Sequence, residues 1–403
     1  MTNYFLLTVP FALVLAGCTT SPAALTKPAA SQSIVYQTNF EQNPFEAGWY
    51  WDKATWEKKA GKPGTALWVD RKDDGKCIEV RDGMWRSPKI SVEPLSFYRV
   101  KLEAKTGANC YWGLLSYDDK DVEIPASPYC QVPASDDWQT NGSAVLIPED
   151  AIYSRVLLWP MKSPLLADNV VVEKLTRKEA LGVMDSIYQE IPKVDPAFAD
   201  KTQTGLSNTA KALKQDGELT IMLIGDSVAN DMGNSNFHLL LEQKYPKARV
   251  TLLNKVGSGA SAKSFLENDK IDAMLEEHDP DLVMFGGMSN RENDVPDIKK
   301  LARRVQARGG TDFLAFTGTM LMPRYWTNIE GSQTHRKPYR EALKGAGGEI
   351  GFAVCDLGGA WEEYVKDAGK PVEFFRRDGH HANEYGKQAY GRLMAAYLLS
   401  AIR

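Results

Sequence analysis

Residues 219–225 read Leu-Thr-Ile-Met-Leu-Ile-Gly and are followed by Asp226-Ser227, and this stretch decides the fold. A continuous apolar run of this length is typical of a strand that is buried on both faces of a parallel sheet. Four similar runs follow, at residues 249–254, 281–287, 312–320 and 351–357. Amphipathic helical stretches, such as residues 295–308, lie between them. We therefore predict an α/β domain over residues 218–403, with a parallel sheet between two helical layers.

The chain upstream of this domain has a different pattern. Eight of the ten tryptophans precede residue 160, among short alternating segments such as 96–104 (SFYRVKLEA) and 169–175 (NVVVEKL). Clusters of turn-forming residues separate these segments, which is typical of an all-β sandwich. We predict a β-sandwich of jelly-roll type over residues 34–175. A polar, helix-prone connector over residues 176–217 then leads to the α/β domain.

Composition and charge exclude some classes of partner. The 403 residues are 43% apolar and 25% charged, which are ordinary values for a globular protein with a sizeable core. Lys and Arg number 48 against 52 Asp and Glu, and no basic block could neutralise a phosphate backbone. We therefore expect no nucleic-acid partner. After residue 17 no run of 18 apolar residues occurs, so the sequence predicts no membrane-spanning helix in the mature chain.

The N-terminus indicates export from the cytoplasm. Residues 5–16 form an apolar run that is too short to span a bilayer but suits a signal peptide. The run ends in Leu15-Ala16-Gly17-Cys18, which resembles the lipobox of bacterial lipoproteins. This resemblance implies that residues 1–17 are removed and that the thiol of Cys18 is acylated, with residues 18–33 as a flexible tether. We expect an extracytoplasmic protein anchored by lipid to a bacterial membrane, the outer membrane by preference. An ordinary secretory signal is the alternative.

Four further cysteines follow Cys18. An oxidising compartment permits disulfides, and Cys110 and Cys130 lie in neighbouring predicted strands, so we predict a disulfide between them. Cys355 lies inside an apolar run and is expected to pack as a small buried side chain. No CxxC or His/Cys ligand spacing occurs, so we predict no metal site.

The strongest chemical signal lies where the first apolar run ends, at Gly225-Asp226-Ser227. A serine there stands at the carboxyl end of a parallel strand and at the start of a helix, where open α/β sheets bind ligands. A serine needs a base to become a nucleophile, and the base needs an orienting carboxylate. Asp378 and His381 lie three residues apart in one loop, and the chain has only five histidines. We therefore predict a triad of Ser227, His381 and Asp378, which needs no cofactor.

These segments resemble an SGNH (GDSL-type) hydrolase, and the resemblance covers residues 219–403. It implies a flavodoxin-like three-layer α/β/α fold, with Ser227 as nucleophile, His381 as base and Asp378 as the acid that orients it. The segment His381-Ala382-Asn383 stands where the family often has His-Pro-Asn.

The same resemblance implies three donors to an oxyanion. The first is the backbone N–H of Ser227. The second is a glycine after the second strand, and by spacing from Asn254 we take Gly259, with Gly257 as a close rival. The third is an asparagine side chain after the third strand. Asn290 is the only amide in reach, and it stands one residue later than the family pattern requires.

The upstream segment resembles the β-sandwich carbohydrate-binding modules attached to many polysaccharide-degrading enzymes, through stretches such as Thr38-Asn39-Phe40-Glu41 and residues 167–172 (ADNVVV). Exposed tryptophans could stack on the apolar faces of sugar rings. In the segment 49–51 (WYW), strand alternation cannot bury all three rings on one face, so at least one should be exposed. We expect residues 176–403 to hold every catalytic group and to hydrolyse small esters without the sandwich.

The combination resembles bacterial polysaccharide O-acetylesterases, which implies a monomeric ester hydrolase that releases acetate from an acetylated carbohydrate. We assign Arg291 and Trp326 to the substrate site, the latter in a long segment after the fourth strand. Two alternatives stay open at this point. One is a lipid or short-chain acyl esterase at the membrane, to which the lipid anchor alone would attach the protein. The other is a catalytically degenerate lipoprotein that binds polysaccharide.

Overall fold

A parallel five-stranded sheet forms the centre of the C-terminal part of this computed structural model, which describes residues 34–52, 64–71, 75–198, 205–287, 294–318 and 329–402. The sheet order is β14-β13-β15-β16-β17, so that the first strand in sequence lies between the second and the third. This is the flavodoxin-like order, as predicted. The strands are β13 (Glu218–Gly225), β14 (Arg249–Asn254), β15 (Leu282–Gly286), β16 (Asp312–Phe316) and β17 (Ala353–Cys355).

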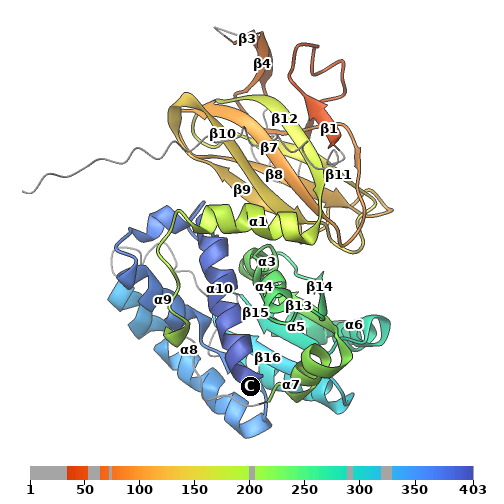
Figure 1. Cartoon of the computed structure of the whole chain (residues 1–403), viewed down its shortest axis with the longest axis vertical. Helices are drawn as coiled ribbons and strands as arrows, with labels where there is room; N and C mark the ends of the chain where they lie inside the picture. Colours follow the sequence, from red (N-terminus) through yellow and green to blue (C-terminus); the bar gives the residue numbers. More distant parts are fainter. Residues whose placement is uncertain are drawn as a thin grey trace, which may run out of the picture. The chain divides into compact units, whose positions relative to one another are not determined.

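Helices cover both faces of this sheet (Figure 1). Ile221 and Leu223 of β13 point into one hydrophobic core, and the intervening Met222 and Ile224 point into another. The first core is completed by α1 (Arg177–Tyr188), α3 (Ser227–Gly233), α4 (Phe237–Lys244), α9 (Leu357–Asp367) and α10 (Glu384–Ala401). The second core is completed by α5 (Ala262–Leu266), α6 (Lys270–His278), α7 (Val295–Ala307) and α8 (Ile329–Ile350). The predicted three layers are therefore present.

Short helical segments connect these elements. A helix, α2 (Ser207–Lys211), and a π-helical turn, η3 (Ala212–Asp216), precede β13. Single 3-10 turns are η2 (Pro196–Phe198), η4 (Glu267–Asp269) and η7 (Val372–Phe375). Among the described residues, no helix combines the length and the apolar character needed to cross a membrane.

Two antiparallel sheets form the N-terminal part. One has the order β10-β7-β12-β4-β3, with β1 on β12, and the other has the order β2-β5-β11-β8-β9, with β6 on β11. Residues of both sheets, such as Val100 and Leu158, share one core. The first sheet contains β1 (Ile34–Thr38), β3 (Ala66–Asp70), β4 (Lys76–Val80), β7 (Phe97–Thr106), β10 (Ser135–Leu146) and β12 (Leu165–Leu175). The second contains β2 (Tyr50–Asp52), β5 (Met84–Arg86), β6 (Ile90–Ser91), β8 (Cys110–Tyr117), β9 (Tyr129–Val132) and β11 (Tyr153–Trp159).

The aromatic segment 49–51 behaves as the alternation argument requires. Trp49 is buried and donates its indole N–H to the hydroxyl of Tyr36 (2.9 Å), whereas Tyr50 is 38% exposed. The exposed ring lies below the guanidinium of Arg155, at 4.9 Å.

The predicted disulfide between Cys110 and Cys130 is absent, and both are free, buried thiols. The register of β8 and β9 explains the error, because Cys110 pairs with Val132 while Cys130 pairs with Trp112. The two cysteines are thus diagonal rather than opposite, which places their Cα atoms roughly 7–8 Å apart, beyond the span of a disulfide. The thiol of Cys110 instead lies 3.2 Å from the hydroxyl of Thr106. Cys355 is buried, as expected.

The two parts share a hydrophobic core. Phe97, Leu146 and Leu175 of the sandwich belong to the same cluster as residues of α1 and α4. Residues 33–403 accordingly form one compact unit, and α1 contacts both β10 and α10. The predicted lipidation site Cys18 and the tether lie outside the described residues.

Candidate active site

Ser227 begins helix α3 directly after β13, and two backbone features fix this turn. Gly225 has a φ of +145°, and a Cβ there would lie 2.0 Å from the carbonyl oxygen of Gly286, so only glycine fits. Asp226 is the N-cap of α3, and its carboxylate accepts from the backbone N–H of Val228 (2.9 Å). Because β13 lies between β14 and β15, Ser227 stands where the strand order reverses, which is where open α/β sheets bind ligands.

The loop between η7 and α10 carries the other two predicted residues. The carboxylate of Asp378 accepts from the backbone N–H of His380 (2.7 Å) and of His381 (2.9 Å), which closes a tight turn. Asn383 is the N-cap of α10 and accepts from the backbone N–H of Gly386 (3.1 Å). Local sequence therefore defines the shape of the loop at both ends.

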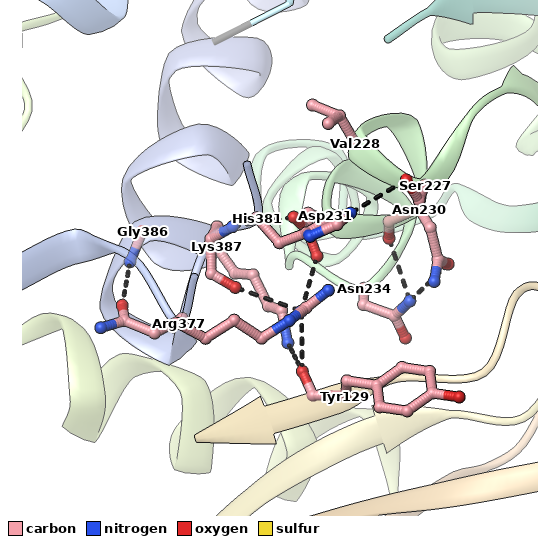
Figure 2. Close-up of polar contacts among 12 residues, drawn as sticks. Tyr129, Ser227, Val228, Asn230, Asp231, Asn234, Arg377, His381, Gly386 and Lys387 are labelled. Atoms are coloured by element: carbon pink, nitrogen blue, oxygen red, sulfur yellow. Dashed lines mark hydrogen bonds and ion pairs between the residues drawn. The ribbon is translucent and has the colours of Figure 1, made fainter. Parts of the chain in front are cut away.

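The structure brings the three predicted residues together, and Figure 2 shows the ring of His381 directed at Ser227. His381 Nε2 lies 2.9 Å from Ser227 Oγ, and His381 Nδ1 lies 2.9 Å from Asp378 Oδ2. With a proton on Nδ1, His381 donates a hydrogen bond to the carboxylate of Asp378. Its Nε2 then carries no proton and can accept from the hydroxyl of Ser227. Burial alone would raise the pKa of Asp378, but the hydrogen bond and charge of His381, together with the charge of Arg377, hold that pKa well below its usual range.

The loop after β14 contains the predicted glycine donor. Gly257 lines the cavity around Ser227, but its backbone N–H already donates to the carbonyl oxygen of Gly225 (2.8 Å). Gly259 has a φ of +65°, is exposed and is not part of the cavity lining, which includes Ser258 instead. Gly259 as an oxyanion donor therefore stays a prediction. Asn254 holds the start of this loop by donating to the side-chain oxygen of Asn230 (2.9 Å).

The remaining predicted site residues fall in segments of which nothing is described. Asn290 and Arg291 lie in residues 288–293, and Trp326 lies in residues 319–328. Among the described residues, no turn or loop carbonyl accepts from the backbone N–H of Ser227, and its role as an oxyanion donor stays a prediction. No group of three or more His, Cys, Asp or Glu residues suited to a metal ion occurs within the described part of the chain.

A buried ion pair supports the triad, and the sequence analysis missed it. Arg377 Nη1 lies 3.0 Å from Asp231 Oδ1, and their side chains are 7% and 2% exposed. The other oxygen of Asp231 accepts from the backbone N–H of Ala382 (2.8 Å), next to His381. Asp231 is four residues after Ser227 on α3, so one carboxylate connects the helix that begins at Ser227 to the loop that carries His381. No local pattern in the sequence indicates this pairing across 146 positions.

The sandwich also holds the triad loop. The carbonyl oxygen of Tyr129 on β9 accepts from Arg377 Nη1 (2.9 Å) and from Lys387 Nζ (2.8 Å) (Figure 2). The hydroxyl of Tyr111 on β8 donates to the carbonyl oxygen of Arg377 (3.0 Å). Two strands of the sandwich thus fix the segment that carries Asp378.

A cavity of about 560 Å³ opens at Ser227 and His381. Its size is in the range of pockets that bind small molecules. Residues of the α/β part line one side, and residues of the sandwich line the other, namely Met84, Tyr111, Glu123, Pro125, Tyr129, Trp159 and Met161. One feature of the sequence could have indicated that a face of the sandwich is covered. Residues 110–117 (CYWGLLSY) are apolar on both alternating faces, which is unusual for an antiparallel strand with one face in water.

No protein-family model and no curated protein matches this chain. Solved structures that resemble it include a two-domain esterase active on acetylated mannans (14% identity, TM-score 0.43, covering 52% of this chain and 57% of that one). A second is a putative GDSL-like lipase from Parabacteroides merdae, with 16% identity and a TM-score of 0.37, covering 45% of this chain and 96% of that one. A third is Axe2, an acetylxylan esterase from Geobacillus stearothermophilus, with 15% identity and a TM-score of 0.37, covering 46% of this chain and 94% of that one. The chain thus matches little more than half of the two-domain esterase. These likenesses are too distant to carry an argument about its function.

Proposed function

We propose that this chain is a serine-dependent carboxylic ester hydrolase that releases acetate from an acetylated carbohydrate. The observation that carries the proposal is the alignment of Ser227 Oγ, His381 Nε2 and Nδ1, and the Asp378 carboxylate, with 2.9 Å at each step. Nucleophile, base and orienting acid in hydrogen-bond reach of one another are what acyl transfer through a serine requires.

The chemistry follows from these positions. Ser227 Oγ attacks the ester carbonyl carbon while His381 Nε2 takes the hydroxyl proton. The tetrahedral intermediate then releases the sugar alkoxide, which receives that proton, and leaves an acyl-serine. Water, deprotonated by the same imidazole, attacks the acyl-serine and releases acetate and free Ser227. Asp378 stabilises the imidazolium in both halves, and the backbone N–H of Ser227 would donate to the developing oxyanion.

The fusion to a tryptophan-rich antiparallel sandwich supports a carbohydrate as the alcohol part of the ester. The location expected from residues 1–18, outside the cytoplasm, agrees with a polysaccharide substrate. Acetylated mannan, on which the two-domain esterase is active, and acetylated xylan, the substrate of Axe2, serve as the test polymers.

Acetate release tests the proposal directly. Purified protein is incubated with acetylated mannan, acetylated xylan and 4-nitrophenyl acetate, and acetate or nitrophenol is measured against the Ser227→Ala variant. We expect acetate from at least one polymer and none from the variant. Binding of a polymer without release of acetate, together with no hydrolysis of 4-nitrophenyl acetate, would overturn the proposal in favour of a binding protein.

A further inference from the structure

Two aromatic residues of the sandwich face the nucleophile's cavity. Tyr111 on β8 and Trp159 on β11 are register partners, and their sequence neighbours Trp112 and Leu158 point into the sandwich core. Because side chains alternate along a strand, Tyr111 and Trp159 point to the opposite face of the sheet. That face lines the cavity that opens at Ser227.

The Trp159 ring is held by its neighbours. Tyr111 and Tyr129 both contact it edge-on, with ring centroids 5.4 Å and 6.3 Å away. Each tyrosine is itself fixed, because Tyr111 donates to the carbonyl oxygen of Arg377 (3.0 Å) and Tyr129 donates to Glu123 (3.1 Å). Trp159 is only partly buried, and no described residue accepts a hydrogen bond from its indole N–H. It therefore offers a ligand both an apolar face and a free donor.

The charges of the cavity favour an uncharged ligand. Arg377 is the only Arg or Lys in the described lining, and Asp231 already neutralises it at 3.0 Å. Glu123 on the sandwich side adds a negative charge, although it accepts from Arg86 (3.0 Å). The carboxylate or sulfate of an acidic sugar would therefore find no counter-charge among the described residues. Neutral hydroxyl groups could donate to the carboxylate of Glu123 and accept from the indole N–H of Trp159.

We propose that Trp159, braced by Tyr111 and Tyr129, is the subsite for the alcohol half of the ester, and that it binds a neutral pyranose ring by stacking. This inference rests on the proposed ester hydrolysis and names its specificity-determining residue. The sandwich then contributes a wall of the catalytic site and is more than a remote binding module.

The test compares Trp159→Ala with Trp138→Ala. Trp138 is a matched control because it lies on β10, in the other sheet, where it packs against Arg71 outside the cavity lining. Both variants and the unchanged protein are assayed on partially acetylated xylo-oligosaccharides and on ethyl acetate, which has no ring. We expect Trp159→Ala to lower kcat/KM on the oligosaccharides at least 10-fold more than kcat/KM on ethyl acetate, mainly through KM. Trp138→Ala should leave both rates unchanged.

Two results would overturn the inference. An equal loss on both substrates would mean that Trp159 only maintains the structure. A preference of the unchanged protein for hexanoate over acetate esters that disappears in Trp159→Ala would mean that the wall binds the acyl chain. If Trp159→Ala does not fold, as judged by circular dichroism, Trp159→Phe keeps a stacking face and should retain an intermediate kcat/KM on the oligosaccharides.

Binding separates this inference from the proposed function. The Ser227→Ala variant is titrated with unacetylated xylo-oligosaccharides by calorimetry, alone and combined with Trp159→Phe. Weaker binding in the combined variant supports the subsite even if no ester is ever hydrolysed. Identical binding in both proteins, with ester hydrolysis intact in the unchanged protein, rejects the subsite and leaves the proposed function standing.

Discussion

Replacing Asp231 with asparagine would test whether the buried ion pair beneath the triad maintains the catalytic geometry. One carboxylate oxygen accepts from Arg377 (3.0 Å) and the other from the backbone N–H of Ala382 (2.8 Å). Asparagine keeps the size of the side chain but removes its charge. Its side-chain NH₂ group is a donor and would face either the guanidinium of Arg377 or the backbone N–H of Ala382, both of which need an acceptor.

Burial determines the magnitude of the effect. Because the two side chains are only 2% and 7% exposed, the buried guanidinium of Arg377 would lose its nearest counter-charge and keep only Asp378, whose Oδ2 lies 3.7 Å from Nε. Removing one partner of a buried pair costs about 3–5 kcal/mol, a large share of a total stability of about 5–15 kcal/mol. A displacement of about 1 Å between catalytic groups can cost about 100-fold in rate. We therefore expect kcat to fall about 10- to 100-fold, with a smaller change in KM.

Urea unfolding followed by tryptophan fluorescence measures the stability, and initial rates on 4-nitrophenyl acetate measure kcat. Asp272→Asn is the matched control, since Asp272 also pairs with an arginine, Arg304, at 2.7 Å, but is 48% exposed. An exposed pair contributes about 0–1 kcal/mol. We expect this control to unfold at nearly the urea concentration of the unchanged protein.

The reasoning would be refuted if Asp231→Asn unfolded at the same urea concentration as the control and kept its kcat. The ion pair would then be incidental to the fold, and the contacts from Tyr111 and Tyr129 would have to hold the loop alone. A loss of stability with full kcat in the fraction that stays folded would refute the catalytic part only.

Three further predictions concern the triad and the interface. Ser227→Ala should lower kcat on acetyl esters by about 10⁴-fold or more with an unchanged melting temperature, and near-full activity would exclude Ser227 as the nucleophile. His381→Ala should match that loss in the same assay, whereas His380→Ala should retain most activity; the reverse result would move the base by one residue. His238 on α4 is fully buried and stacks on Phe97 of the sandwich, with ring centroids 5.7 Å apart. Burial, aided by the charges of Arg177 and Arg249, holds the pKa of His238 well below its ordinary value. Because the unfolded chain takes up this proton near pH 6.5 and the folded chain does not, stability should decrease as the pH falls below 6.5. His238→Phe should reduce that dependence in urea titrations at pH 7 and pH 5.

The residues that could be predicted are those whose signal is local. The run at 219–225 forms β13, a strand covered on both faces, in which every residue of the run except Thr220 is buried. Ser227 directly follows β13, and a second loop directly follows β14. Both could be placed at one edge of the sheet, since parallel strands have their carboxyl ends at the same edge. Asp378 and His381 could be paired because a turn of three residues already places the carboxylate near the ring.

What could not be predicted depends on contacts between distant segments. The disulfide prediction failed because strand neighbourhood alone does not reveal register, and a shift of two residues separates Cys110 from Cys130. The activity expected of residues 176–403 alone stays a prediction, and the sequence did not indicate that the sandwich lines one side of the cavity. Strand alternation indicates which residues of β8 share a face, but it does not indicate what covers that face.

The sandwich contacts each of the three segments that form the site. The carbonyl oxygen of Ser127 accepts from Asn230 on the helix of the nucleophile (3.0 Å). Asp150 pairs with Lys255 in the loop after β14 (2.8 Å), and Tyr111 donates to the triad loop. A linked binding module raises only the local concentration of a polymeric substrate, so it affects polymers and leaves small esters unchanged. A wall that positions the catalytic loops affects kcat for every ester. Since these contacts reach all three segments, we expect the proposed catalytic unit to include the sandwich and its removal to lower kcat for every ester.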